Sequence, residues 1–200
     1  MVTLPSHYTN YDVMNLADEW DDHTKKIVTQ RLAPFPTPGA LNEAEVRTVK
    51  IIASHLIYDD RDQVLAYIVH HLDSKLSAKT GESQRKVGSP KERDLILHGL
   101  KALDLLAQDL YQLPFAEADT QAQLNMLEML QQGQVPQITD WSLCPPKELF
   151  KKLLSIIVDA YYSHPIIWSE IGYGGPAYPR GYVRVELGLT DPWEAKKDGQ

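Results

Sequence analysis

The chain has 200 residues, of which 43% are hydrophobic and 24% are charged. This length fits one ordinary domain with a hydrophobic core of its own, and the composition excludes a largely disordered chain. The net charge is −7 with no clustered basic patch, which argues against nucleic acid as a partner, and no apolar stretch approaches the roughly 20 residues that span a bilayer. We therefore expect a protein partner.

Residues 1–41 are predicted to form an N-terminal arm that ends in a proline-rich connector. Residues 24–32 offer one short helical candidate, and three prolines within residues 34–38 then exclude a helix. The acidic cluster at residues 18–22 occupies the region where a signal peptide would be cationic or apolar. We therefore expect no export signal and a cytoplasmic location.

A first helix is predicted over residues 42–56. Asn42 as the N-cap, with Glu45 three positions later, has the pattern of a capping box. Apolar residues then recur at helical spacing: Val46, Val49, Ile52, Ala53 and Leu56. Asp59 and Asp60 interrupt this pattern, and a second helix resumes it with Val64, Leu65, Ile68, Leu72 and Leu76. A polar loop is predicted over residues 77–88.

Residues 89–92 predict the start of a long third helix. Ser89 is the expected N-cap, Pro90 the first helical position, and Glu92 the acid that faces the helix dipole. Its buried stripe is formed by Ile96, Leu100, Leu103, Ala107 and Leu110. Pro114 ends this helix.

Two more helices complete the predicted core. Thr120 and Gln123 suggest a second capping box before a helix that ends at Gly133. The pair Pro145-Pro146 begins the last helix, which runs past Tyr161 until His164-Pro165 ends it. We therefore predict an all-α protein, a single domain of about five helices with a helical core at 42–164 and non-helical, aromatic-rich arms at 1–41 and 165–200.

Common catalytic and metal-binding patterns are missing from the sequence. None of the seven histidines has Asp or Glu three residues before it, as a dimetal helical bundle would require. The single cysteine, Cys144, lies beside prolines, which predicts a small apolar residue near a helix start rather than a nucleophile. We therefore predict no catalytic residue, metal site or cofactor site in this chain.

The run of glycines, prolines and tyrosines at residues 172–182 predicts a shaped surface loop, because glycine permits positive φ and proline removes backbone donors. The loop is suited either to docking or to lining a ligand pocket. Tyr, Trp and Arg are the usual anchors of protein interfaces, and we predict docking by Trp168, Tyr173, Tyr178, Arg180, Tyr182 and Trp193. Arg180 pairs either with an acid of this chain or with one on the partner. The tail from residue 183 either covers its own domain or adds to a partner.

The C-terminal residues 161–165, 168–173, 174–182 and 191–194 together resemble the C-terminal signature of the gluconate 2-dehydrogenase subunit 3 family. A looser similarity reaches back through the helices and covers most of residues 35–195. The resemblance implies a small helical subunit with no catalytic residues of its own.

The resemblance also implies the partner. Proteins of this family accompany a glucose-methanol-choline type FAD oxidoreductase large subunit that acts on sugar acids, sugars or polyols, so the FAD is expected in the partner. Some complexes include a cytochrome c subunit. Many members carry a twin-arginine signal, and this sequence departs from them there. Either the complex stays in the cytoplasm, which we expect, or export relies on another subunit, or the start of the sequence was trimmed. The alternative hypothesis is a stand-alone helical domain that binds a small ligand.

Overall fold

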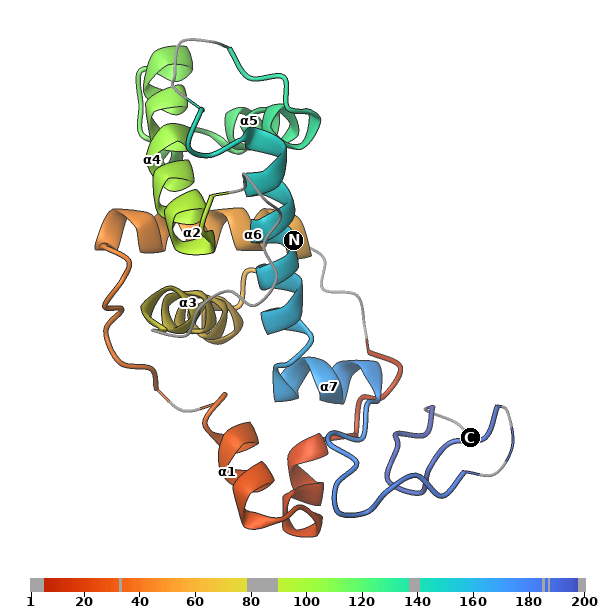
Figure 1. Cartoon of the computed structure of the whole chain (residues 1–200). Coiled ribbons are helices and arrows are strands. Elements are labelled where there is room, and N and C mark those ends of the chain that lie inside the picture. The colour runs from red at the N-terminus through yellow and green to blue at the C-terminus, as the bar shows by residue number, and fades with distance from the viewer. Residues whose placement is uncertain are drawn as a thin grey trace. The chain divides into compact units, whose positions relative to one another are not determined.

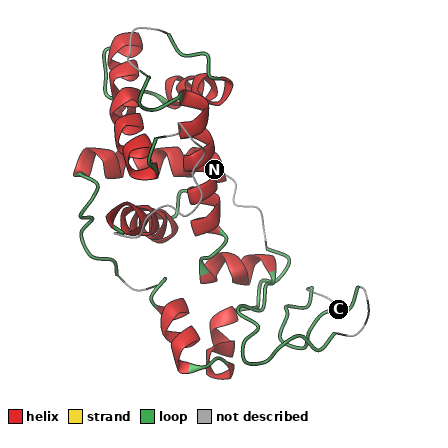
Figure 2. Ribbon diagram, viewed as in Figure 1, coloured by secondary structure: helices red, strands yellow, loops and turns green. Residues whose placement is uncertain are grey.

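The structure, a computed structural model, describes residues 6–32, 34–78, 90–136, 141–184, 186 and 188–197. Every regular element within these ranges is a helix, as Figure 2 shows. The prediction of an all-α protein is therefore confirmed. The chain divides into two compact units, Pro36–Asp159, here called the helical unit, and Met1–Phe35 with Ala160–Gln200, here called the terminal unit.

The helical unit is built from long amphipathic helices and a short 3-10 helix. These are α2 (Glu43–Ile57), α3 (Asp62–Ser77), α4 (Glu92–Tyr111), the 3-10 helix η2 (Phe115–Glu117), α5 (Thr120–Gln132) and most of α6 (Pro146–Tyr161), all labelled in Figure 1 except η2. α2 packs against α3 and η2, and α4 packs against η2 and α5. The predicted stripes supply the core, because Ile52, Ile68 and Leu103 are at most 1% exposed. Burial of these aliphatic faces is the main source of stability in this unit.

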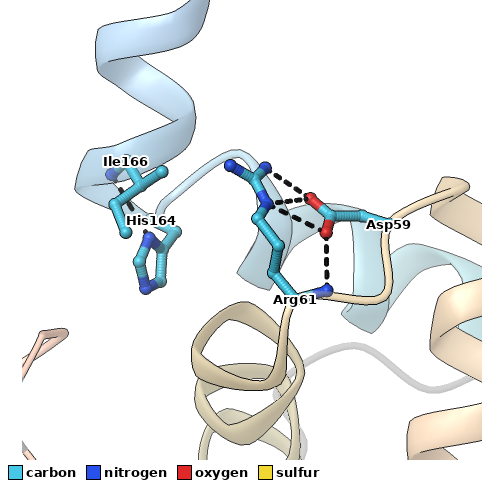
Figure 3. A network of polar contacts seen from close by, with 4 residues as sticks. All are labelled: Asp59, Arg61, His164 and Ile166. Atoms are coloured by element: carbon cyan, nitrogen blue, oxygen red, sulfur yellow. Dashed lines mark hydrogen bonds and ion pairs between the residues drawn. The ribbon is translucent and has the colours of Figure 1, made fainter. Parts of the chain in front are cut away.

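Local polar contacts hold the start of α2 and the turn between α2 and α3. The predicted capping box of α2 is present, with Glu45 N donating to Asn42 Oδ1 at 3.0 Å and Asn42 N donating to Glu45 Oε2 at 2.9 Å. Tyr58 ends α2 in the left-handed region at φ 55°. The next turn is closed by Arg61, whose Nη2 pairs with the buried carboxylate of Asp59 at 2.5 Å (Figure 3). Asp59 and Arg61 thus hold the turn that separates α2 from α3.

Two predicted helix starts are wrong in detail. α4 begins at Glu92 with Lys91 as its N-cap, so Pro90 precedes the helix, and Ser89 lies outside the described residues. α5 is capped by Asp119, one residue before the expected Thr120, because its carboxylate accepts an amide hydrogen bond at 2.9 Å. Gln123 is therefore not a capping-box residue. Its buried side-chain amide instead donates to the carbonyl of Phe115 at 3.1 Å.

Asp73 anchors the end of the proline-rich connector in the helical unit. Its carboxylate accepts three backbone N–H bonds, from Gly39 at 3.0 Å, Ala40 at 2.8 Å and Leu41 at 3.0 Å. Burial by itself raises the pKa of Asp73, but the three N–H donors together outweigh burial and hold the pKa below its usual value. The connector is thus tied to α3 by a charged group at a point where the chain has no secondary structure.

The terminal unit contains short helices in both arms, so the prediction of non-helical arms is corrected. They are η1 (Val13–Glu19), α1 (Asp22–Thr29) and α7 (Pro165–Ile171) (Figure 1). His164-Pro165 was expected only to end a helix. It also begins α7, because His164 Nδ1 accepts the Ile166 N–H at 3.2 Å and Pro165 occupies the first turn (Figure 3).

Within the described ranges, none of the helices is both long enough and apolar enough to cross a bilayer.

Candidate partner-docking surface

Trp168 lies in the core of the terminal unit. Its side chain is only 6% exposed and packs in a cluster with Val13, Trp20 and Val28. The indole Nε1 donates a hydrogen bond to the carbonyl of Tyr162 at 2.6 Å. A partner cannot reach a ring that is covered in this way. Trp168 therefore stabilises the terminal unit from within its core.

The glycines of residues 172–175 lie against aromatic rings from other segments of the terminal unit. A Cβ atom added to any of the three would come within 3.0 Å of a ring atom, closer than real Cβ contacts allow. The pairs are Gly172 with Tyr8 at 2.6 Å, Gly174 with Trp193 at 2.6 Å and Gly175 with Trp20 at 2.7 Å. The glycine-rich run is therefore an internal packing surface for the unit's own aromatic residues.

Arg180 connects three segments of the terminal unit. Its Nη1 donates to Glu19 Oε2 at 3.0 Å, and its Nη2 donates to the carbonyls of Gly174 at 2.6 Å and Pro176 at 3.0 Å. The guanidinium also lies 4.7 Å from the ring centre of Trp193. Its side chain is 7% exposed. Of the two pairings that the sequence left open, the structure contains the one within this chain.

The C-terminal tail folds back on the terminal unit. Asp191 Oδ1 accepts the backbone N–H of Val183 at 2.7 Å and that of Arg184 at 2.8 Å. Asp191 is 2% exposed, and its own N–H donates to Glu194 Oε2 at 3.0 Å. The described part of the tail thus follows the first of the two alternatives, in which it covers its own domain.

Tyr11 joins the N-terminal segment to this tail. Its hydroxyl donates to the carbonyl of Trp193 at 2.9 Å. Burial raises the pKa of Tyr11 to about 12, and the nearby charge of Arg180 offsets only part of that effect. The hydroxyl therefore stays protonated, and remains a hydrogen-bond donor, at any physiological pH.

Three of the predicted docking residues, all tyrosines, are exposed. Tyr178 is 70% exposed, Tyr182 68% and Tyr173 40%. The rings of Tyr173 and Trp168 form a T-shaped pair with ring centres 5.4 Å apart. Burial is the largest cause of the raised pKa of Tyr173, and the charge of Tyr182 is the second. Val183 and Leu189, which follow Tyr182 in the C-terminal tail, are also exposed and add apolar area.

The six predicted docking residues therefore divide into two groups. Trp168, Arg180 and Trp193 make contacts within the terminal unit, while Tyr173, Tyr178 and Tyr182 face solvent. We call the three exposed tyrosines the tyrosine surface. Exposed aromatic side chains on a loop that is itself held in place are typical of a protein interface.

Sequence reasoning missed the N-terminal half of this arrangement. Tyr8, Tyr11, Glu19 and Trp20 all contact the C-terminal loop or tail. A compositional signal was available, since the acidic and aromatic residues of the first segment complement the arginine and the glycines of the last. Nothing in their spacing, however, indicates which residue pairs with which.

The terminal unit also contains a shallow recess of about 250 Å³. It is lined by Ser6, Tyr8, Thr9, Tyr11, Asp12, Ile166, Ser169 and Glu170. Several of its polar groups already make hydrogen bonds inside the unit. Ser6 donates to the carbonyl of Glu170 at 2.8 Å, and Ser169 Oγ accepts the N–H of Val13 at 3.1 Å. The recess thus offers a ligand few groups that are not already engaged.

Cys144 is buried, at 1% exposure, two positions before the start of α6. This confirms the interpretation as a small apolar residue near a helix start. Among the described residues, no group of three or more His, Cys, Asp or Glu side chains is arranged to hold a metal ion.

Comparison with known protein families gives a match. The profile of a family described as Gluconate 2-dehydrogenase subunit 3 matches residues 43–175. This range includes all of α2 to α7 and ends within the glycine-rich run. No curated protein and no solved structure matches the chain.

Proposed function

Because the chain belongs to the gluconate 2-dehydrogenase subunit 3 family, we propose that it is a non-catalytic small subunit that binds, and stabilises or matures, a FAD-dependent oxidoreductase. The family description names a subunit of a dehydrogenase. The proposed partner is a large subunit of the glucose-methanol-choline type, which carries the FAD and acts on a sugar acid, a sugar or a polyol. A cytochrome c subunit is a further proposed component.

The observation that carries the proposal is the tyrosine surface. Tyr178 and Tyr182 expose about two thirds of their area, yet the residues on either side of them are held by hydrogen bonds within the terminal unit. Such an arrangement lowers the conformational entropy that is lost on binding, because the loop is already ordered. Tyrosine also combines a large apolar ring with a polar tip, which suits a surface that meets water when the partner is absent.

Co-expression tests the proposal directly. The tagged chain is produced together with the large oxidoreductase of the glucose-methanol-choline type from the same source. We expect both chains to co-purify in fixed proportion, with the absorbance of bound flavin and with dye-linked dehydrogenase activity. A colourless chain that purifies alone, while the large subunit folds and binds flavin without it, contradicts the proposal.

The contribution of the tyrosine surface is tested by the double substitution Tyr178→Ala with Tyr182→Ala. Truncation of an interface hot spot costs about 2 kcal/mol or more, which corresponds to roughly a 30-fold loss of affinity for each residue that contacts the partner. The matched control is Tyr58→Ala, which removes a tyrosine of the helical unit that is 79% exposed. Weakened pairing only in the double variant assigns the contact to the tyrosine surface, whereas equal pairing by both variants rejects that assignment.

The recess in the terminal unit is the observation that bears on the alternative, a stand-alone ligand-binding domain. The engaged polar groups of the recess make this function the weaker proposal. A ligand-binding domain would be stable alone and would show a rise in melting temperature with gluconate or a related polyol.

The cytoplasmic location stays a proposal, which fractionation of the co-expressing cells tests.

A further inference from the structure

We infer that Arg180 is a positioning residue, which holds the tyrosine surface in its binding shape from inside the terminal unit without contacting the partner. This inference rests on the proposed function, because a positioning role has meaning only if the surface binds a partner. It assigns to Arg180 a different task from the one that its residue type suggests, since arginine is usually an interface anchor.

Arg180 is part of the turn that carries Tyr178. The N–H of Gly181 donates to the carbonyl of Ala177 at 2.6 Å, which closes a turn with Tyr178 and Arg180 inside it. From this turn the guanidinium of Arg180 reaches back to the carbonyls of Gly174 and Pro176. The backbone on the N-terminal side of Tyr178 is thereby tied to the turn, while the Tyr178 side chain remains 70% exposed.

The backbone on the C-terminal side of the turn is held by the tail. Tyr182 is followed by Val183 and Arg184, whose backbone N–H groups bind Asp191 in the tail. The same tail contains Trp193, over whose ring the Arg180 guanidinium lies. Arg180 thus links the two sides of the segment that carries the exposed tyrosines.

The contacts of Arg180 differ in how strongly they hold the loop. Glu19 is 48% exposed, so water and salt screen its ion pair with Arg180. Nη2 donates to both carbonyls while the guanidinium carbon lies 4.7 Å from the ring centre of Trp193, and the single nitrogen of a lysine cannot occupy both positions. The geometry therefore predicts that lysine cannot replace Arg180, even though lysine would keep the charge.

The chemistry of the surroundings excludes a direct role in binding. Nη1 and Nη2 of Arg180 both donate to groups of this chain, and the guanidinium lies over the Trp193 ring. With 7% of its side chain exposed, Arg180 has little surface to present to a partner. Its effect on pairing must act through the loop.

The test uses Arg180→Lys, with Arg184→Lys as the matched control, because Arg184 is an exposed arginine in the same segment. Hydrogen exchange is measured on the isolated full chain, and affinity for the large subunit is measured on the complex. For Arg180→Lys we expect about tenfold faster exchange of the amides at residues 174–184 and about tenfold weaker pairing, since two charge-assisted bonds are lost. Arg184→Lys should leave the exchange unchanged.

Glu19→Gln provides a second, milder variant that guards against a general failure to fold. It should raise exchange and weaken pairing by about threefold or less, because the screened ion pair contributes least. In all variants the circular dichroism of the helices reports whether the rest of the chain stays folded.

Each other outcome has a distinct meaning. Weaker pairing of Arg180→Lys with unchanged exchange would show that Arg180 contacts the partner, which overturns the inference. Faster exchange with unchanged pairing would show that the shape of the loop does not matter for binding, which also overturns it. If the unsubstituted chain fails to pair with the large subunit, the proposed function itself fails, and the positioning role fails with it.

Discussion

The two units of this chain are stabilised in different ways. The helical unit depends on aliphatic side chains that repeat along each helix and meet in a core, as Ile52, Ile96 and Leu103 do. The described part of the terminal unit has only short helices, and a small cluster around Trp20 and Trp168 forms its core. Its order comes from single contacts between distant segments. The helical unit should therefore resist the loss of one contact. In the terminal unit, the loss of one contact can release a whole segment.

The first prediction sets the scale for the helical unit. Phe115 in η2 is fully buried, and Phe115→Ala should lower the free energy of unfolding by about 3–5 kcal/mol, because the lost burial is added to the cost of a cavity. Urea unfolding followed by circular dichroism measures this change. Leu105→Ala on α4 is the control, since Leu105 is 57% exposed and its loss should cost less than about 0.5 kcal/mol. Similar values for the two variants would mean that this core is not packed as described.

The second prediction isolates one contact of the terminal unit. Gly175 has φ 76°, and a Cβ atom there would lie 2.7 Å from Trp20. Gly175→Ala should therefore cost about 2–4 kcal/mol, from backbone strain and overpacking together. Tryptophan fluorescence and hydrogen exchange should show the loss in the terminal unit.

Gly181→Ala is the matched control for that substitution. Gly181 has φ 74° but nothing within 4 Å of the added Cβ atom, so only the strain of about 1–2 kcal/mol applies. Equal effects of the two substitutions would show that the close contact of Gly175 with the Trp20 ring adds nothing to stability. The terminal unit would then not depend on this contact.

The same contrast explains which features could be predicted from the sequence. The stripe of α2 and the capping box of Asn42 and Glu45 follow local rules, in which one residue specifies what the next few must do. α7 was missed because seven residues are too short to show a helical period, and because His164-Pro165 fits the end of a helix as well as a start. Local patterns therefore account for most of the helical unit.

The contacts of the candidate site follow no local rule. Glu19 and Arg180 are 161 positions apart, and several other acids of this chain have the same charge to offer. The type of residue indicated that Arg180 was important, but its partner depends on how the two ends of the chain fold together. For the same reason Trp168 and Trp193 were predicted as docking residues, although both of them pack within the terminal unit.

The third prediction concerns a contact of the helical unit that resembles those of the terminal unit, in which the carboxylate of Asp73 binds the backbone of residues 39–41. Asp73→Asn should cost about 2 kcal/mol, because a neutral amide replaces a carboxylate that accepts three N–H bonds. Asp62→Asn, also in α3, is the control. The side chain of Asp62 is 85% exposed in its pair with Lys50, so its loss should cost less than about 1 kcal/mol.

The pKa of Asp73 gives this prediction a second readout. The pKa is lower in the folded state than in the unfolded chain, where it is about 3.9, so the folded state holds fewer protons on this group. Its stabilising effect is complete above that pH and is lost as the pH falls through the lower, folded value. The difference in stability between the native chain and Asp73→Asn should therefore shrink in acid. A difference that is independent of pH would mean that the charge of Asp73 has no part in the tie.

The last and smallest effect is expected for Tyr11→Phe in the terminal unit. The substitution removes the hydrogen bond to the carbonyl of Trp193 and should cost about 1 kcal/mol.

The pKa of Tyr11, about 12 in the folded state against the ordinary 10.0, means that the folded chain keeps a proton that the unfolded chain releases. Stability from this group is therefore present below about pH 10 and is lost as the pH rises toward the folded pKa. Because the hydroxyl is half-buried, solvent screening limits this loss to less than about 1 kcal/mol. Urea unfolding between about pH 9 and pH 11 measures it, since the native chain should lose more stability over that interval than the variant. Parallel pH profiles would show that Tyr11 ionises as freely in the folded chain as in water, and that the tail is not held to the N-terminal segment at this point.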